Sequence, residues 1–173
     1  MKYDEEKIKK LYGKNLRDAC NSLASLCVAE GRTPTLTGLN GWVFEQTIRY
    51  CLSRELKILK LSPAINEQVN LIGRKKIDLL ISDRVAIEAK AAGSFGRKKD
   101  EKYIGQTYEL NKGYVEKRGW KYFYLTLHEN NRSYRDAYES AFGKDNSFFL
   151  DTPGDWGKFV NAVAKCISPL KKP

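Results

Sequence analysis

The segment of residues 77–90 (IDLLISDRVAIEAK) constrains the fold more than any other part of the sequence. Its two short apolar runs, residues 77–82 and 85–90, are joined by a brief polar connection, so the segment is predicted to form a β-hairpin. Apolar residues occupy both sides of the runs, which is typical of strands covered on both faces. The hairpin is therefore expected at the centre of a sheet that has helices packed against it.

Helix-like and strand-like periods alternate along the rest of the 173-residue chain. The spacing predicts helices over residues 4–12, 14–30, 41–56, 102–119, 131–144 and 155–167. It predicts further strands over 64–72, 121–129 and 147–151, and a loop over 91–100. With the two N-terminal helical segments counted together, the order ααβββαβαβα indicates an α/β fold with a mixed central sheet flanked by helices. The length suits a single domain over 1–173, with residues 1–40 as an N-terminal helical extension packed on it.

Basic residues are in clear excess, with 31 Lys and Arg against 21 Asp and Glu, which gives a formal net charge of +10. Such a surplus attracts polyanions, chiefly nucleic acid. No window approaches the roughly 20 apolar residues of a membrane span, and no signal-peptide pattern follows Met1. We therefore expect a cytoplasmic protein that does not act on membranes.

Several catalytic classes lack their sequence signature. The four cysteines form no CxxC pair and the single histidine, His128, lies far from all of them, which argues against a structural zinc site. A phosphate-binding P-loop and a GxGxxG pattern are also missing from the sequence, so nucleotide hydrolysis is not indicated.

Three charged residues interrupt the apolar hairpin. Glu88 and Lys90 are two residues apart and share one face of their strand, and Asp78 falls opposite them on the partner strand. Burying such charges costs several kcal/mol each unless a partner compensates, and a divalent cation is a natural partner for two carboxylates. The alternative is a strand cap at Asp78 and a solvent-facing Glu88–Lys90 pair on an edge strand.

Asp78, nine intervening residues and then Glu88-Ala89-Lys90 on a hairpin resemble the signature of the PD-(D/E)XK nuclease superfamily. The resemblance covers roughly residues 41–127 and includes the expected core order αβββαβ of the restriction-endonuclease-like fold. One departure is that Ile77 stands where the motif name has proline.

The resemblance implies specific roles. Asp78 and Glu88 would bind Mg²⁺, for which Mn²⁺ can substitute, together with the carbonyl of Ala89, while Lys90 assists the attacking water. By position, Glu45 and Gln106 match a glutamate before the sheet and a glutamine after the lysine strand in many members, although either can be a plain surface residue. Partial burial of Lys90 is expected to lower its pKa, which would allow it to deprotonate the water.

Basic residues next to the hairpin are candidates for binding DNA phosphates. They form one run in the turn before the Asp78 strand and another in and beside the loop after the Lys90 strand. The candidates are Arg74, Lys75, Lys76, Arg97, Lys98, Lys99 and Lys102.

The expected function is a Mg²⁺-dependent endonuclease that hydrolyses double-stranded DNA, of the restriction or homing type, acting as a homodimer so that two sites address two strands. A structure-specific nuclease of branched DNA, similar to a Holliday-junction resolvase, is the near alternative. A non-catalytic DNA-binding protein that retains the fold, and a nuclease subunit that needs a partner for targeting, are also open.

Overall fold

The computed structural model describes residues 1–29, 39–73, 75–91, 99–127 and 132–168, with side chains omitted for residues 26, 28, 99–107 and 132–134. Its helices are α1 (Glu5–Ala29), α2 (Leu39–Ile58), α3 (Lys99–Glu116), α4 (Arg132–Phe142), the 3₁₀ turn η1 (Lys144–Asn146) and α5 (Asp155–Ile167). Its strands are β1 (Ile65–Ile72), β2 (Lys75–Ile81), β3 (Val85–Lys90), β4 (Lys121–Thr126) and β5 (Ser147–Phe149). The predicted element order and the α/β class are confirmed.

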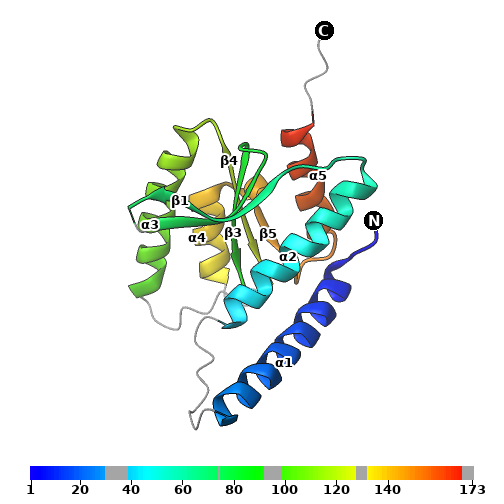
Figure 1. The fold of residues 1–173 in the computed structure, drawn as a ribbon. Helices are drawn as coiled ribbons and strands as arrows, with labels where there is room; N and C mark the ends of the chain where they lie inside the picture. Colours follow the sequence, from blue (N-terminus) through cyan, green and yellow to red (C-terminus); the bar gives the residue numbers. More distant parts are fainter. Residues whose placement is uncertain (30–38, 74, 92–98, 128–131, 169–173) are drawn as a thin grey trace.

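The five strands form one mixed sheet in the order β1-β2-β3-β4-β5 (Figure 1). The β1–β2 and β2–β3 pairs are antiparallel, whereas β3–β4 and β4–β5 are parallel. The β2–β3 hairpin lies in the middle of this order, as predicted, and Arg84 N–H closes its turn on the Ile81 carbonyl at 3.0 Å. The carboxyl end of β3, which carries the acidic and basic residues of interest, therefore points the same way as the carboxyl ends of β4 and β5.

Each face of the sheet carries its own hydrophobic core. One core joins α1, α2 and α5 to residues such as Leu79, Ile87 and Leu125. The other joins α3 and α4 to Leu80, Ala86 and further residues of β1, β2, β4 and β5. Alternate residues of β3 enter opposite cores, because successive side chains of a strand point to opposite faces. This two-sided burial leaves little room for a charged group in the centre of the sheet unless other groups neutralise it.

The N-terminal helix differs from the prediction. Residues 4–12 and 14–30 were expected as two helices, but α1 runs without a break through Gly13. Glycine inside a helix costs only about 1 kcal/mol. Packing outweighs that cost, because Ile8 is fully buried, Tyr12 is almost so, and Leu16 packs against the same core. In Figure 1, α1 lies alongside α2 and extends beyond the rest of the fold.

Several element boundaries also differ from the prediction, each by three residues or fewer. β2 begins at Lys75, so Lys75 and Lys76 belong to the strand and not to the turn before it. α3 begins at Lys99, which had been expected in a loop. β4 ends at Thr126, three residues before the predicted end. Differences of this size are usual where hydrogen bonding at the end of an element decides its limit.

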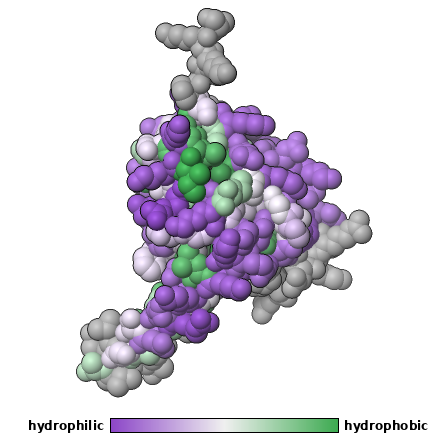
Figure 2. Space-filling view, turned by 90° about the vertical axis from the view of Figure 1, so that its right-hand side faces the viewer, coloured by the Kyte–Doolittle hydropathy of each residue, from purple (hydrophilic) through white to green (hydrophobic). Residues whose placement is uncertain are grey.

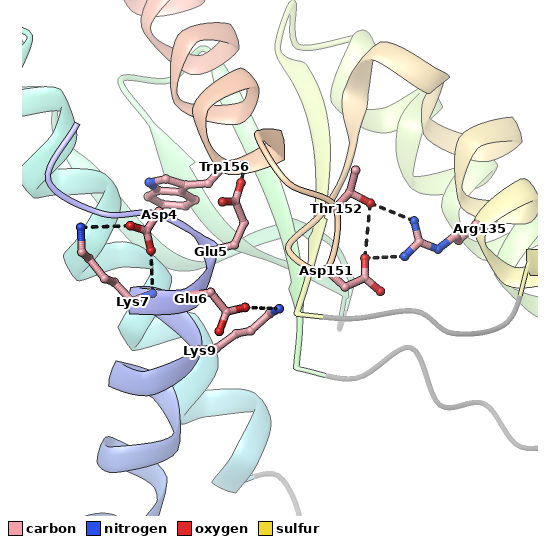
Figure 3. Close-up of polar contacts among 9 residues, drawn as sticks. All are labelled: Asp4, Glu5, Glu6, Lys7, Lys9, Arg135, Asp151, Thr152 and Trp156. Atoms are coloured by element: carbon pink, nitrogen blue, oxygen red, sulfur yellow. Dashed lines mark hydrogen bonds and ion pairs between the residues drawn. The ribbon is translucent and has the colours of Figure 1, made fainter.

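Polar contacts tie the N-terminal segment to the body of the protein. The Trp156 N–H, at the start of α5, donates to the Glu5 carboxylate at 2.9 Å (Figure 3). The buried Glu55 carboxylate on α2 accepts the backbone N–H groups of Lys2 at 2.7 Å and Tyr3 at 2.6 Å. A separate ion pair joins Arg135 of α4 to Asp151, in the segment that follows β5 (Figure 3).

On the side that lies to the right in Figure 1, the surface is largely hydrophilic, and hydrophobic surface is confined to separate areas (Figure 2). Among the described helices, none has the length and apolar character needed to cross a membrane.

Replacing Glu55 tests the N-terminal anchor. Glu55→Ala leaves two backbone N–H groups without their acceptor, and we expect it to lower the free energy of unfolding by about 2–3 kcal/mol. Urea denaturation measures this change. Glu116→Ala, at the exposed end of α3, serves as the control and should stay within about 0.5 kcal/mol of the wild type. Equal stability of the two variants would contradict the anchoring role.

Candidate functional site

The candidate site forms where the β2–β3 ladder ends. Backbone pairing of the hairpin stops at Leu79 and Ile87. At the residue before Leu79 in β2, the Asp78 carboxylate replaces the missing backbone acceptor and receives the Ala89 N–H at 2.9 Å. The strand geometry therefore fixes Asp78 against the carboxyl end of β3, as the hairpin register predicted.

Lys90 holds the two hairpin carboxylates together. Its Nζ lies 3.0 Å from Asp78 Oδ2 and 2.6 Å from Glu88 Oε1. Only 10% of each acidic side chain is exposed, whereas 29% of the Lys90 side chain is exposed. The Glu88–Lys90 pair predicted on one face of its strand thus joins Asp78 in a three-residue ionic cluster. Lys90 is the most accessible member of this cluster. The alternative of an edge-strand pair facing solvent is wrong, because β3 is the middle strand.

Glu45 approaches this cluster from α2. Its pKa is raised to about 7, first by burial and then by the negative charge of Asp78, with Lys90 acting in the opposite direction. Gln68 of β1 donates to Glu45 Oε2 at 2.9 Å. Gln68 lies between Glu67 and Val69, whose partners on β2 flank Asp78. Glu45 therefore belongs to the electrostatic environment of the hairpin and is more than a surface residue of its helix.

The protonation of the cluster follows from its burial and charges. Burial raises the pKa of Glu88, and Lys90 opposes that effect. For Lys90, burial lowers the pKa, but Glu88 and Asp78 together outweigh it, so the pKa is raised. The expectation that partial burial lowers the pKa of Lys90 is therefore wrong for this arrangement. Lys90 is an ammonium group that donates hydrogen bonds to both acids.

Two residues that the sequence did not reveal as functional hold Glu88 in position, one by a direct hydrogen bond and the other through the first. The hydroxyl of Tyr122 on β4 donates to Glu88 Oε2 at 3.3 Å. The side chain of Asn111 on α3 hydrogen-bonds to Tyr122 in turn. Asn111 and Tyr122 are both buried, and burial raises the pKa of Tyr122 so that its hydroxyl remains a donor. The aromatic residues 122–124 are all buried, and nothing in the sequence distinguishes the one hydroxyl that meets Glu88.

The remaining predicted residues are only partly described. Lys75 is half-buried and Lys76 exposed at the start of β2, close in sequence to Asp78. Lys99, Lys102 and Gln106 lie on α3, but their side chains are outside the described part of the structure. Arg74, Arg97 and Lys98 are outside the described residues altogether. Phosphate binding by these residues stays a prediction.

The donor set suits a hard divalent cation. Among the described side chains, no three His, Cys, Asp or Glu groups come together as a metal-ligating group. Mg²⁺, however, typically takes one or two carboxylates and completes its shell with water and phosphate oxygens. In the part of the chain that the structure describes, the acids Glu45, Asp78 and Glu88 lie near one ammonium, that of Lys90, so the acids outnumber the cation beside them. Asp78 and Glu88 would hold the Mg²⁺, and the Ala89 carbonyl stays a predicted third ligand.

Comparisons with protein-family models, with curated proteins and with solved structures gave no significant match. The assignment of function therefore rests on the geometry and charge of the site.

The raised pKa of Glu45 predicts a pH-dependent effect on stability. A carboxyl whose pKa is higher in the folded than in the unfolded state stabilises the fold at low pH, and this contribution is lost as the pH rises through the folded-state pKa of about 7. In metal-free buffer, Glu45→Gln should therefore gain stability relative to the wild type as the pH increases from about 5 to about 8. Urea midpoints across this range measure the difference. Parallel curves would show that the pKa of Glu45 is not raised in the folded state.

Proposed function

We propose that this protein is a Mg²⁺-dependent nuclease that hydrolyses phosphodiester bonds in DNA. The observation that carries the proposal is the Asp78–Lys90–Glu88 cluster, buried in a central hairpin at the carboxyl end of β3. Open α/β sheets bind their ligands outside the carboxyl ends of their strands. The formal net charge of +10 supports a polyanionic substrate.

Each residue of the cluster suits one part of phosphodiester hydrolysis. Asp78 and Glu88 are the carboxylates that would hold the cation. When bound, such an ion stabilises the negative charge that develops on the phosphate and lowers the pKa of water. The Lys90 ammonium, the most exposed member, can donate to a phosphate oxygen or orient the attacking water. As an ammonium it is a charge-stabilising donor, and Glu45 offers a carboxyl that can accept a proton nearby.

Burial explains why these groups would act on a phosphate and not only on one another. Electrostatic interactions strengthen where water is excluded, so fixed charges there stabilise a developing charge without reorganising. The Ala89 N–H and the Tyr122 hydroxyl hold the two acids in place before substrate binds. This pre-organisation favours catalysis over simple binding. We further propose that the enzyme works as a homodimer on duplex DNA, since two strands need two sites.

Incubation of the purified protein with supercoiled plasmid, with Mg²⁺ and with EDTA, tests the proposal. We expect nicked or linear DNA only with Mg²⁺. Asp78→Asn and Lys90→Met should each lower the cleavage rate by about 10²–10⁴-fold, because they remove a cation-binding carboxylate and a charge-stabilising donor. A four-way-junction oligonucleotide, assayed in parallel, distinguishes cleavage of plain duplex from cleavage of branched DNA.

Asp83→Asn is the matched control for these variants. Asp83 is exposed in the turn at the opposite end of the same hairpin, so its replacement removes an acid from β2–β3 without touching the cluster. The control should cleave like the wild type. Metal-independent cleavage, or full activity of Asp78→Asn, would disprove the proposal.

Tyr122 is predicted to act as a positioning residue for Glu88. Tyr122→Phe removes the hydrogen bond to Glu88 Oε2, and supporting contacts of this kind typically change metal affinity by about 10–100-fold. Isothermal titration with Mn²⁺ measures the affinity independently of activity, and thermal denaturation checks the fold.

Tyr124→Phe supplies the control for this variant. Tyr124 is fully buried on the same face of β4, two residues from Tyr122, and stacks on Tyr138 at 4.0 Å between ring centroids. Its replacement also removes one buried hydroxyl but leaves the bond to Glu88 intact. Equal Mn²⁺ affinities for the two variants would show that Tyr122 is only a core residue.

A further inference from the structure

The outward face of α2 combines cations with aromatic rings. We call this face the outward stripe of α2, and its members are Trp42, Gln46, Arg49, Tyr50, Ser53, Arg54 and Lys57. The opposite face is buried in the core with α1 and α5, so the stripe is the part of the helix left to solvent. Such a stripe in a basic protein can be a plain solvated surface, and three further observations argue against that reading.

The first observation is that the acids of α2 are turned away from the stripe. Glu55 is buried and binds backbone N–H groups of the N-terminal segment. Glu45 is directed to Gln68 and the hairpin cluster. One acid from β1, Glu67, pairs with Arg49 at 2.7 Å. Among the described residues, neither Arg54 nor Lys57 has an acidic partner, so the outer end of the stripe keeps its positive charge.

The second observation concerns the aromatic residues. Trp42 is 56% exposed and Tyr50 49% exposed. Among the side chains that the structure describes, they are the only aromatic ones in the exposed class, and both lie on this stripe. Aromatic rings on a positively charged surface are the usual means of binding unpaired bases, which stack on the rings while the cations follow the phosphates.

The third observation is continuity with the candidate site. Trp42 and Arg49 lie three and four residues to either side of Glu45, so they adjoin it on the helix surface. Lys57 lies twelve residues beyond Glu45, about 18 Å along the helix axis. Lys2 joins Arg54 and Lys57 around a shallow hollow at that end. The stripe therefore leads from the cluster to a basic hollow without leaving one rigid helix.

We infer that the outward stripe of α2 binds an unpaired strand of the nucleic-acid substrate. This inference rests on the proposed nuclease function and narrows its substrate to DNA that has a single-stranded segment beside the scissile bond, such as a branched or frayed duplex. Bases stacked inside a duplex cannot lie on Trp42 or Tyr50, whereas the bases of an unpaired strand can. The cations of the stripe bind its phosphates.

Fluorescence anisotropy with labelled oligonucleotides in EDTA tests the inference without cleavage. The probes are a single strand of about 20 nucleotides, the matching duplex of about 20 base pairs, and that duplex extended by a single-stranded overhang of about 20 nucleotides. The wild type should bind the single strand and the overhang more tightly than the blunt duplex. Arg54→Gln/Lys57→Gln should weaken single-strand binding about tenfold and reduce the slope of log K against log salt by about 1.4.

Two further variants separate stacking from general charge. Trp42→Ala should weaken single-strand binding roughly 5- to 100-fold through lost stacking, with little change in the salt slope. Lys117→Gln/Lys165→Gln removes the same charge from exposed positions on other parts of the molecule and should change binding by no more than about twofold.

The outcomes distinguish the inference from the proposed function. If the wild type binds DNA but the α2 variants match the Lys117/Lys165 control, the inference is wrong and the nuclease proposal stands. If the α2 variants weaken only the blunt duplex, the stripe contacts paired DNA and the inference is again wrong. If the wild type binds none of the probes, the inference is wrong, and plasmid cleavage with Mg²⁺ decides the nuclease proposal by itself.

Discussion

The contact of one ammonium group with two buried carboxylates is the interaction on which the site depends. Asp78 and Glu88 are taken out of water in the middle of a sheet, and isolated buried charges of this kind cost several kcal/mol each. Lys90 compensates both, and its raised pKa shows that their attraction exceeds the effect of its own burial. Any ligand that binds here must replace or share this compensation, and a divalent cation with a phosphate is one that can.

The position of the cluster follows from the way the hairpin ends. Inside the β2–β3 ladder, backbone groups satisfy one another and side chains enter apolar cores, so a charge there would be unsupported. Past Leu79 and Ile87 the ladder stops, and the free Ala89 N–H becomes a donor for Asp78. The end of β2–β3 backbone pairing thus leaves the Ala89 N–H available as the hydrogen-bond donor that the buried Asp78 carboxylate requires.

The sequence was sufficient for the order of elements and for the meeting of Asp78, Glu88 and Lys90, because strand period and a short turn determine which side chains lie opposite each other. It did not reveal Tyr122, Asn111 or Gln68, because these residues reach the cluster through strand order and helix packing, which no local pattern encodes. The continuous helix through Gly13 and the raised pKa of Lys90 were missed for a related reason. In both cases a tertiary contact, with the core or with two carboxylates, outweighed the local tendency of the residue.

Helix α2 connects these features, since one rigid element serves the core, the site and the outer surface. Its buried face fills the core with α1 and α5, and Glu55 fixes its end to the N-terminal segment. Ten residues earlier, Glu45 faces the hairpin cluster. A rotation of the helix by one residue, about 100°, would carry Glu45 away from Gln68 and expose apolar side chains at the same time. The core packing that stabilises the fold therefore also sets the direction of Glu45 and of the outward stripe, so the geometry of the site and of the proposed strand-binding surface is determined by a single packing arrangement.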